Sequence, residues 1–204
     1  MAEAERIDRN LNLIIPVMED EDKDKSPIAW AHHTGLPTNL FKQYWKIIGQ
    51  TMQALVADQV GLFAARYAAY ELREIAEARG IWKNYKVGDD TKIGVEMGLY
   101  NEMIRRTNVA LPRPSGWEAM PFADVKSGNI LTEDQIDELE GAIVFFMVGS
   151  RSHLQSQRRQ VLGGLILWNA APTSSSFTEF MHSLQTSKSK EISGEKQIVS
   201  LPTR

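Results

Sequence analysis

The chain contains no cysteine, and this absence excludes two classes of site. Without thiols there is neither a disulfide framework nor a thiolate metal site, and the composition is compatible with a reducing cytosol. Apolar runs of about 20 residues, which a membrane span requires, are also missing. The N-terminus MAEAERIDRN is charged, and the apolar LNLII after it is too short for a signal peptide. We therefore expect a cytosolic protein with no membrane partner.

An excess of positive charge is likewise missing. The 26 acidic residues outnumber the 23 lysines and arginines, which gives a formal net charge of −3. Nucleic acids and anionic membranes are bound by basic faces, so we expect no nucleic-acid partner. A length of 204 residues with 43% hydrophobic residues is sufficient for one globular domain.

Known catalytic and cofactor motifs are missing as well. The sequence has neither HExxH nor GxSxG, and its glycines match neither a P-loop nor a dinucleotide fingerprint. His32 and His33 would point to opposite sides of an extended segment, so they are not a ready pair of metal ligands. One acidic cluster consists of Asp134, Asp137, Glu138 and Glu140. We interpret it as helix N-terminal charge on a solvent-exposed face. We expect no catalysis, metal or cofactor.

The sequence does contain one strong helix signal, at 132–150. Thr132 followed by Gln135 predicts a capping box, which begins a helix. Apolar residues then recur at helical spacing: Ile136, Leu139 and Ile143. From Ala142 to Val148 the chain is apolar without interruption, and such a helix must be enclosed by other protein. The rest of the chain is predicted to pack around this segment.

Other helices are predicted from apolar periodicity and capping residues at 38–56, 63–80, 93–106, 120–126, 154–170 and 176–185. The last follows a second capping box, Ser176 with Glu179. Residues 27–33 are typical of a short strand, which could pair with residues 11–17 as a small hairpin. The stretch 108–117 contains Pro112 and Pro114 and is interpreted as a proline-punctuated connection.

These elements predict a mainly α-helical fold, a single-domain bundle of about five to seven helices with room for a minor N-terminal β-hairpin. The domain limits follow from composition. Residues 1–26 are predicted to be a flexible N-terminal segment, residues 27–187 the helical domain, and residues 188–204 a flexible C-terminal tail that is polar and has no aromatics.

Five residues are candidates for partner binding. Arginine pairs at 105–106 and 158–159 could converge into a patch for an acidic partner, although compensation of helix ends explains the same pairs. Trp117 follows the proline-containing stretch, and its exposure would indicate a binding surface. The candidate set is Trp117, Arg105, Arg106, Arg158 and Arg159.

Three blocks carry a resemblance to a known family. They are PIAWAHHTGLPTNLFKQYWKIIGQTM (27–52), GWEAMPFADVKSGNILTEDQIDELEGAIVFFMVGSRSH (116–153) and LWNAAPTSSSFTEFMHSLQTS (167–187). In order and residue character they resemble small proteins encoded among the tail genes of long-tailed bacteriophages. None of the blocks is a catalytic signature, so the resemblance transfers no catalytic residue.

The resemblance implies a tail assembly chaperone-like protein that binds the tape-measure protein in the host cytoplasm, without catalysis. A partner helix would lie in a groove lined by aromatics and flexible methionines. The methionines suited to this are Met52, Met97, Met103, Met120 and Met147. Two alternatives stay open. One is a structural protein of the virion neck or tail, and the other is a small helical enzyme whose site is assembled from scattered residues.

Overall fold

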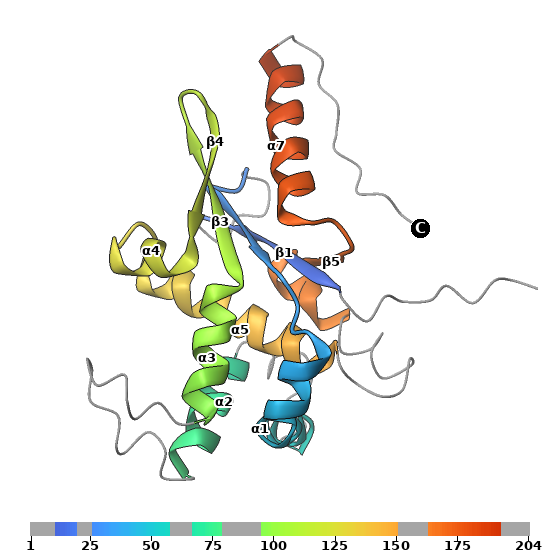
Figure 1. Ribbon diagram of the computed structural model, residues 1–204. Coiled ribbons are helices and arrows are strands. Elements are labelled where there is room, and N and C mark those ends of the chain that lie inside the picture. Colours follow the sequence, from blue (N-terminus) through green and yellow to red (C-terminus); the bar gives the residue numbers. More distant parts are fainter. Residues whose placement is uncertain (1–10, 20–25, 58–66, 79–94, 151–162, 193–204) are drawn as a thin grey trace, which may run out of the picture.

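The computed structural model describes residues 11–19, 26–57, 67–78, 95–150 and 163–192. Within these ranges the chain forms a five-stranded antiparallel sheet and six α-helices (Figure 1). The fold combines sheet and helices in separate layers and is α/β. The prediction of a mainly α-helical bundle is therefore wrong.

The sheet has the strand order β4-β3-β2-β1-β5, and each neighbouring pair is antiparallel. Its strands are β1 (Asn12–Val17), β2 (Ala29–His33), β3 (Thr107–Arg113), β4 (Gly116–Pro121) and β5 (Ala171–Thr173). The predicted hairpin of β1 and β2 is confirmed, with Ile15 opposite Ala31. Because β1 belongs to the sheet, the folded region begins before residue 27.

Strands β3 and β4 stand where a proline-punctuated connection was predicted. Val109, Ala110 and Leu111 are all buried, as in a strand that is covered on both faces. Pro112 does not prevent this pairing, because β3 contacts β2 only as far as Ala110 and beyond it has a neighbour on one side alone. A missing amide donor is tolerated at such a free edge.

The helices are α1 (Thr38–Ala57), α2 (Ala68–Ala78), α3 (Val95–Arg105), α4 (Phe122–Ser127), α5 (Glu133–Gly149) and α7 (Phe177–Ile192). A short 3-10 helix, η4 (Gly164–Trp168), stands near the end of the helix predicted over 154–170, and residues 154–162 of that prediction lie outside the described residues. Helix α7 continues past residue 187, where the tail was predicted to begin. Among the described helices, none is long and apolar enough to cross a membrane.

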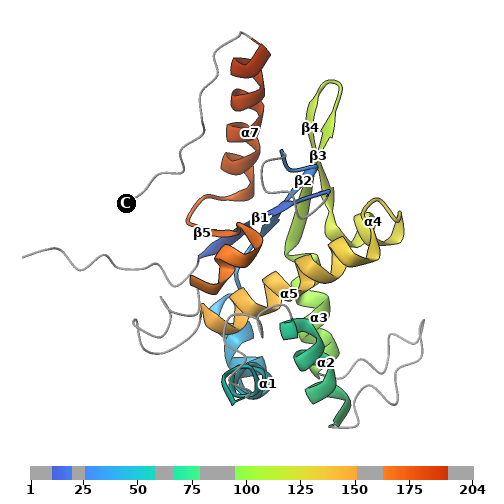
Figure 2. The same cartoon turned by 180° about the vertical axis from the view of Figure 1, so that it is seen from behind.

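Helix α5 is the central helix that the sequence predicted. Its capping box is present: the Gln135 amide donates to Thr132 Oγ1 at 3.3 Å, and the Thr132 amide donates to Gln135 Oε1 at 3.0 Å. Every residue from Leu139 to Gly149 is buried. Figure 2 shows α5 running across one side of the sheet, between the strands and the helices α1, α2 and α3.

The sheet is covered on both faces, and the adjacent histidines of β2 show this. The His33 ring meets Phe146 of α5 edge-on, with 6.2 Å between the ring centroids. The His32 ring stacks on Phe180 of α7, at 5.8 Å. The predicted opposite orientation of the two histidines is confirmed. The larger helical layer therefore lies on the His33 face, and α7 lies on the His32 face.

Candidate functional site

The predicted arginine pair at the end of α3 is engaged within the chain. Arg105 donates to Glu102 Oε2 at 2.7 Å, and Arg106 Nε donates to the same oxygen at 3.2 Å. The hydrogen bond from Arg105 lowers the pKa of Glu102 below its ordinary value. This is compensation near a helix end, the alternative already given for these arginines.

The structure does not bring Trp117 and these arginines together. Trp117 is half-buried on β4 opposite Pro112, whereas Arg106 directly precedes the other end of β3. Five residues of extended chain separate those ends, or about 17 Å. The predicted pair Arg158 and Arg159 lies outside the described residues.

The predicted methionine-lined groove receives little support from the positions of its methionines. Met103 and Met147 are buried in the core, and Met52 and Met120 are half-buried against it. The side chain of Met97 lies outside the described part of the chain. A docking surface must therefore be found elsewhere.

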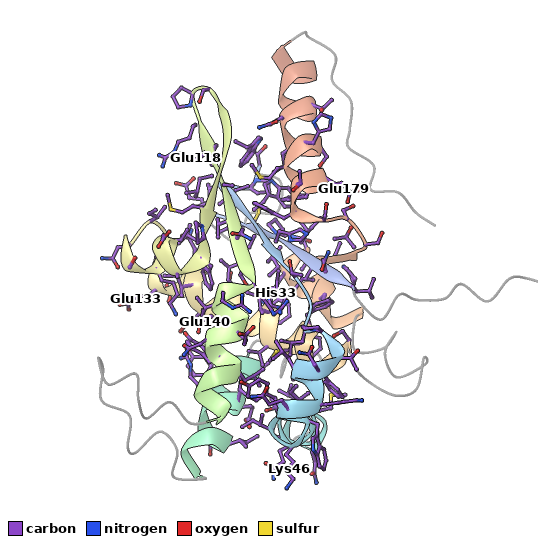
Figure 3. The ribbon with its side chains drawn as sticks, in the orientation of Figure 1. His33, Lys46, Glu118, Glu133, Glu140 and Glu179 are labelled. Carbon is purple, nitrogen blue, oxygen red and sulfur yellow. The ribbon has the colours of Figure 1, made fainter. Side chains whose placement is uncertain are left out.

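A buried charge cluster joins four helices around Glu140 of α5. Both carboxylate oxygens are engaged: Arg73 of α2 donates to Oε2, while Lys126 of α4 donates to Oε1. Tyr100 of α3 also donates to Oε1, at 2.7 Å, and Lys126 donates to the Tyr100 hydroxyl at 2.6 Å. The Glu140 side chain is fully buried, and Figure 3 shows it in the interior beside α3. The prediction that it lies on a solvent-exposed face is wrong.

The electrostatics of this cluster keep its cations charged. Burial alone would lower the pKa of Lys126, but hydrogen bonds to Glu140 and Tyr100 outweigh burial and raise it. Burial and the charge of Glu140 raise the pKa of Tyr100, so its hydroxyl stays protonated and remains a donor. The arrangement is a clamp that holds α2, α3 and α4 to α5. Because both oxygens of the carboxylate already accept hydrogen bonds, its geometry favours a structural role over proton transfer.

The two buried histidines are held in the neutral form. Each ring donates one hydrogen bond, from His32 Nε2 to the Ser175 carbonyl at 3.0 Å and from His33 Nδ1 to Thr107 Oγ1 at 2.9 Å. The hydroxyl of Thr107 itself donates to the Met103 carbonyl, which fixes it as an acceptor for His33. Burial lowers the pKa of His33 to about 3. Among the described residues, no group of three or more histidines and acids could hold a metal ion.

The outer face of α1 carries the most exposed tryptophan of the described residues. Trp45 is 56% exposed, and the Lys46 ammonium lies 5.9 Å from its ring centroid. Figure 3 shows Lys46 at the end of the molecule that lies away from the sheet. Exposed residues at helical spacing make up this face, which we call the α1 stripe: Lys42, Trp45, Lys46, Gly49 and Gln53.

The α1 stripe was missed by the sequence interpretation, although a signal for it was present. The buried residues Tyr44, Ile47 and Ile48 fix the inward side of α1. Trp45 follows Tyr44 and cannot share that side. A large aromatic outside the apolar face of an amphipathic helix indicates a binding surface.

Comparisons of the chain with models of protein families, with curated proteins and with solved structures gave no match. The α1 stripe is therefore the candidate functional site on physical grounds: it is exposed, aromatic and basic. The charge cluster around Glu140 holds α2 and α3 to α5, and α1 packs against these helices. The cluster therefore helps to fix the position of the α1 stripe.

Proposed function

We propose that this chain is a non-enzymatic binding protein of phage tail assembly, which engages the tape-measure protein in the host cytoplasm. The observation that carries the proposal concerns the first of the family-like blocks, residues 27–52. That block folds into β2, which is buried in the sheet, and α1, which presents Trp45 to solvent. Exposed tryptophans are favoured anchors of protein interfaces.

A surface of this kind suits a chaperone-like role. The indole supplies a large apolar area, and the flanking lysines keep that area hydrated while no partner is bound. An apolar segment of a long partner would bury the indole and be shielded from aggregation. The rigid support beneath α1 favours reversible docking over refolding, because the inner side of α1 packs into the core through Tyr44, Ile47 and Ile48.

Co-expression with the tape-measure protein from the same tail-gene cluster tests this proposal. An affinity-tagged chain should retain the tape-measure protein on the resin and increase its soluble fraction. Retention of the tape-measure protein at the level of an untagged control would contradict the proposal. Mass spectrometry of purified virions separates the alternative: absence from mature particles supports a released assembly factor, whereas a copy number matching a tail protein makes the chain a structural component.

A further inference from the structure

Gly49 lies in the middle of the 20-residue helix α1, where glycine is less favourable than any other residue except proline. A Cβ atom built on Gly49 would meet nothing within 4 Å among the described residues. Its backbone is helical and does not need a positive φ angle. Neither its backbone conformation nor packing against the described residues therefore accounts for the glycine.

Gly98 of α3 differs from Gly49 in having a close neighbour within the chain. A Cβ atom there would lie 2.7 Å from the hydroxyl oxygen of Tyr44, so the buried Tyr44 side chain would have to shift to admit it. Gly49 has the same freedom to admit a close neighbour, but on the outer side of α1. Glycine permits a backbone from another molecule to approach closely.

The charges on the same face are one-sided. Helix α1 contains no aspartate or glutamate, although acids outnumber bases in the chain as a whole. Lys42 and Lys46 are exposed, and neither forms an ion pair within the described part of the chain. By contrast, Arg105 and Arg106 both pair with Glu102. Among the described residues, no acidic side chain therefore pairs with the lysines of the α1 stripe.

We propose that the α1 stripe binds an acidic α-helix of the tape-measure protein, which crosses α1 closely at Gly49. This inference rests on the proposed function and adds to it the docking surface and the chemistry of the bound segment. Trp45 inserts beside the crossing point as the apolar anchor, and carboxylates on the bound helix face Lys42 and Lys46. Electrostatic complementarity of this kind sets orientation and speeds association.

A helix fits this surface better than an extended strand does. Strand addition requires unpaired backbone groups on the receiving surface. The stripe follows one side of a helix, so it offers side chains instead. A partner helix laid against it gains its closest approach at the one position without a Cβ atom. The partner should therefore carry a small residue at the crossing and acids on either side.

The experiment measures the affinity of purified full-length chain for overlapping 25-residue peptides that span the tape-measure protein, and for the whole tape-measure protein. We expect the tightest peptides to be acidic and helix-forming. Lys42→Glu with Lys46→Glu should weaken binding about ten-fold or more, and Trp45→Ala about 30-fold, as for an interface hot spot. Gly49→Leu should abolish close approach and weaken binding to a similar extent.

Matched controls separate docking from folding. Lys42→Arg with Lys46→Arg retains both charges and should retain binding, and Tyr67→Ala removes an aromatic of equal exposure, 56%, that lies before α2. Gly49→Ala should raise thermal stability while lowering affinity, a combination that misfolding cannot produce. If the wild-type chain binds the tape-measure protein and the α1 variants bind equally well, this inference is overturned and the proposed function stands.

Two other outcomes are equally decisive. If neither the wild-type chain nor any variant binds the tape-measure protein, the proposed function fails first. If sedimentation shows that the wild-type chain dimerises and that Trp45→Ala makes it monomeric, a second copy covers the α1 stripe and the tape-measure assignment is overturned.

Discussion

Replacing Glu140 by glutamine tests whether the buried charge cluster stabilises the helical layer. The substitution preserves the shape of the side chain and removes its charge. Arg73 and Lys126 then lack the carboxylate that both contact. The glutamine amide has one oxygen that accepts hydrogen bonds, where the carboxylate has two. Tyr100 loses a charged acceptor as well. The helices α2, α3 and α4 should all be held less firmly to α5.

The size of the effect follows from how deeply each partner is buried. Removing one member of a buried ion pair costs roughly 3–5 kcal/mol when the remaining charge is also buried. Here the side chains of Arg73 and Lys126 are 35% and 29% exposed, so water compensates in part. We therefore expect Glu140→Gln to lower the free energy of unfolding by about 3 kcal/mol. Lys126→Met should cost only about 1.5 kcal/mol, because Arg73 and Tyr100 still satisfy the carboxylate.

Urea denaturation followed by tryptophan fluorescence measures both values, and buried Trp168 provides a reporter in the described core. Glu140→Gln should shift the midpoint without changing the slope, and should lower the melting temperature by about 6–12 °C for a chain of this size. The reasoning is refuted if Glu140→Gln stays within 1 kcal/mol of wild type, or if Lys126→Met proves more damaging than Glu140→Gln.

Three further predictions concern the core, the glycines and the helix cap. His33 has a pKa near 3 in the folded state against 6.5 when exposed, so the unfolded chain binds the proton first and stability should fall as pH drops from 6.5 towards 3. Urea midpoints measured across that pH range should show the loss of stability, and His33→Asn should make the midpoint less dependent on pH. Gly98→Ala should destabilise by about 1 kcal/mol through its clash with Tyr44, whereas Gly49→Ala should stabilise by about 1 kcal/mol, and calorimetry distinguishes the two signs. Thr132→Ala should cost about 1 kcal/mol in urea by removing the α5 cap, and an unchanged midpoint would contradict the capping role.

Local signals predicted the elements that depend on local chemistry. The capping boxes at Thr132 and Ser176, the burial of the run from Ala142 to Val148, and the hairpin of β1 and β2 all came from neighbouring residues. The capping boxes join side chains three positions apart, and the other signals are apolar patterns within single short segments. These are the parts of the fold that the structure confirms.

The sheet as a whole could not be predicted from such signals. Strands β2 and β3 are neighbours in space, yet the described helices α1, α2 and α3 lie between His33 and Thr107 in the chain. Pro112 and Pro114 favoured a connection over a strand. Pro112 is acceptable in β3 because it lies past Ala110, the last residue of β3 that pairs with β2. The apolar run Val109–Leu111 was present in the sequence, but periodicity in so short a run does not identify a buried strand.

The buried charge cluster around Glu140, which supports the helical layer beneath the candidate site, was missed for a related reason. Glu140 follows Ile136 by four residues and precedes Ile143 by three, so helical geometry already placed it on the apolar face. Its cations come from distant positions, Arg73 and Lys126, which no local pattern connects. The predicted arginines, by contrast, were prominent as adjacent pairs in the sequence, and at Arg105–Arg106 the structure shows them neutralised by Glu102.

The position of β5 has a consequence for synthesis on the ribosome. Asn12 donates a hydrogen bond to the Ser175 carbonyl across 163 positions of chain, and β5 pairs with the outer edge of β1. At about 5–20 residues per second, translation separates these two partners by roughly 8–30 s, whereas a hairpin closes in microseconds. During that interval, a hairpin of β1 and β2 has an open strand edge and a His32 face that α7 does not yet cover. Chains that stall before residue 171 should be the species that associate edge to edge.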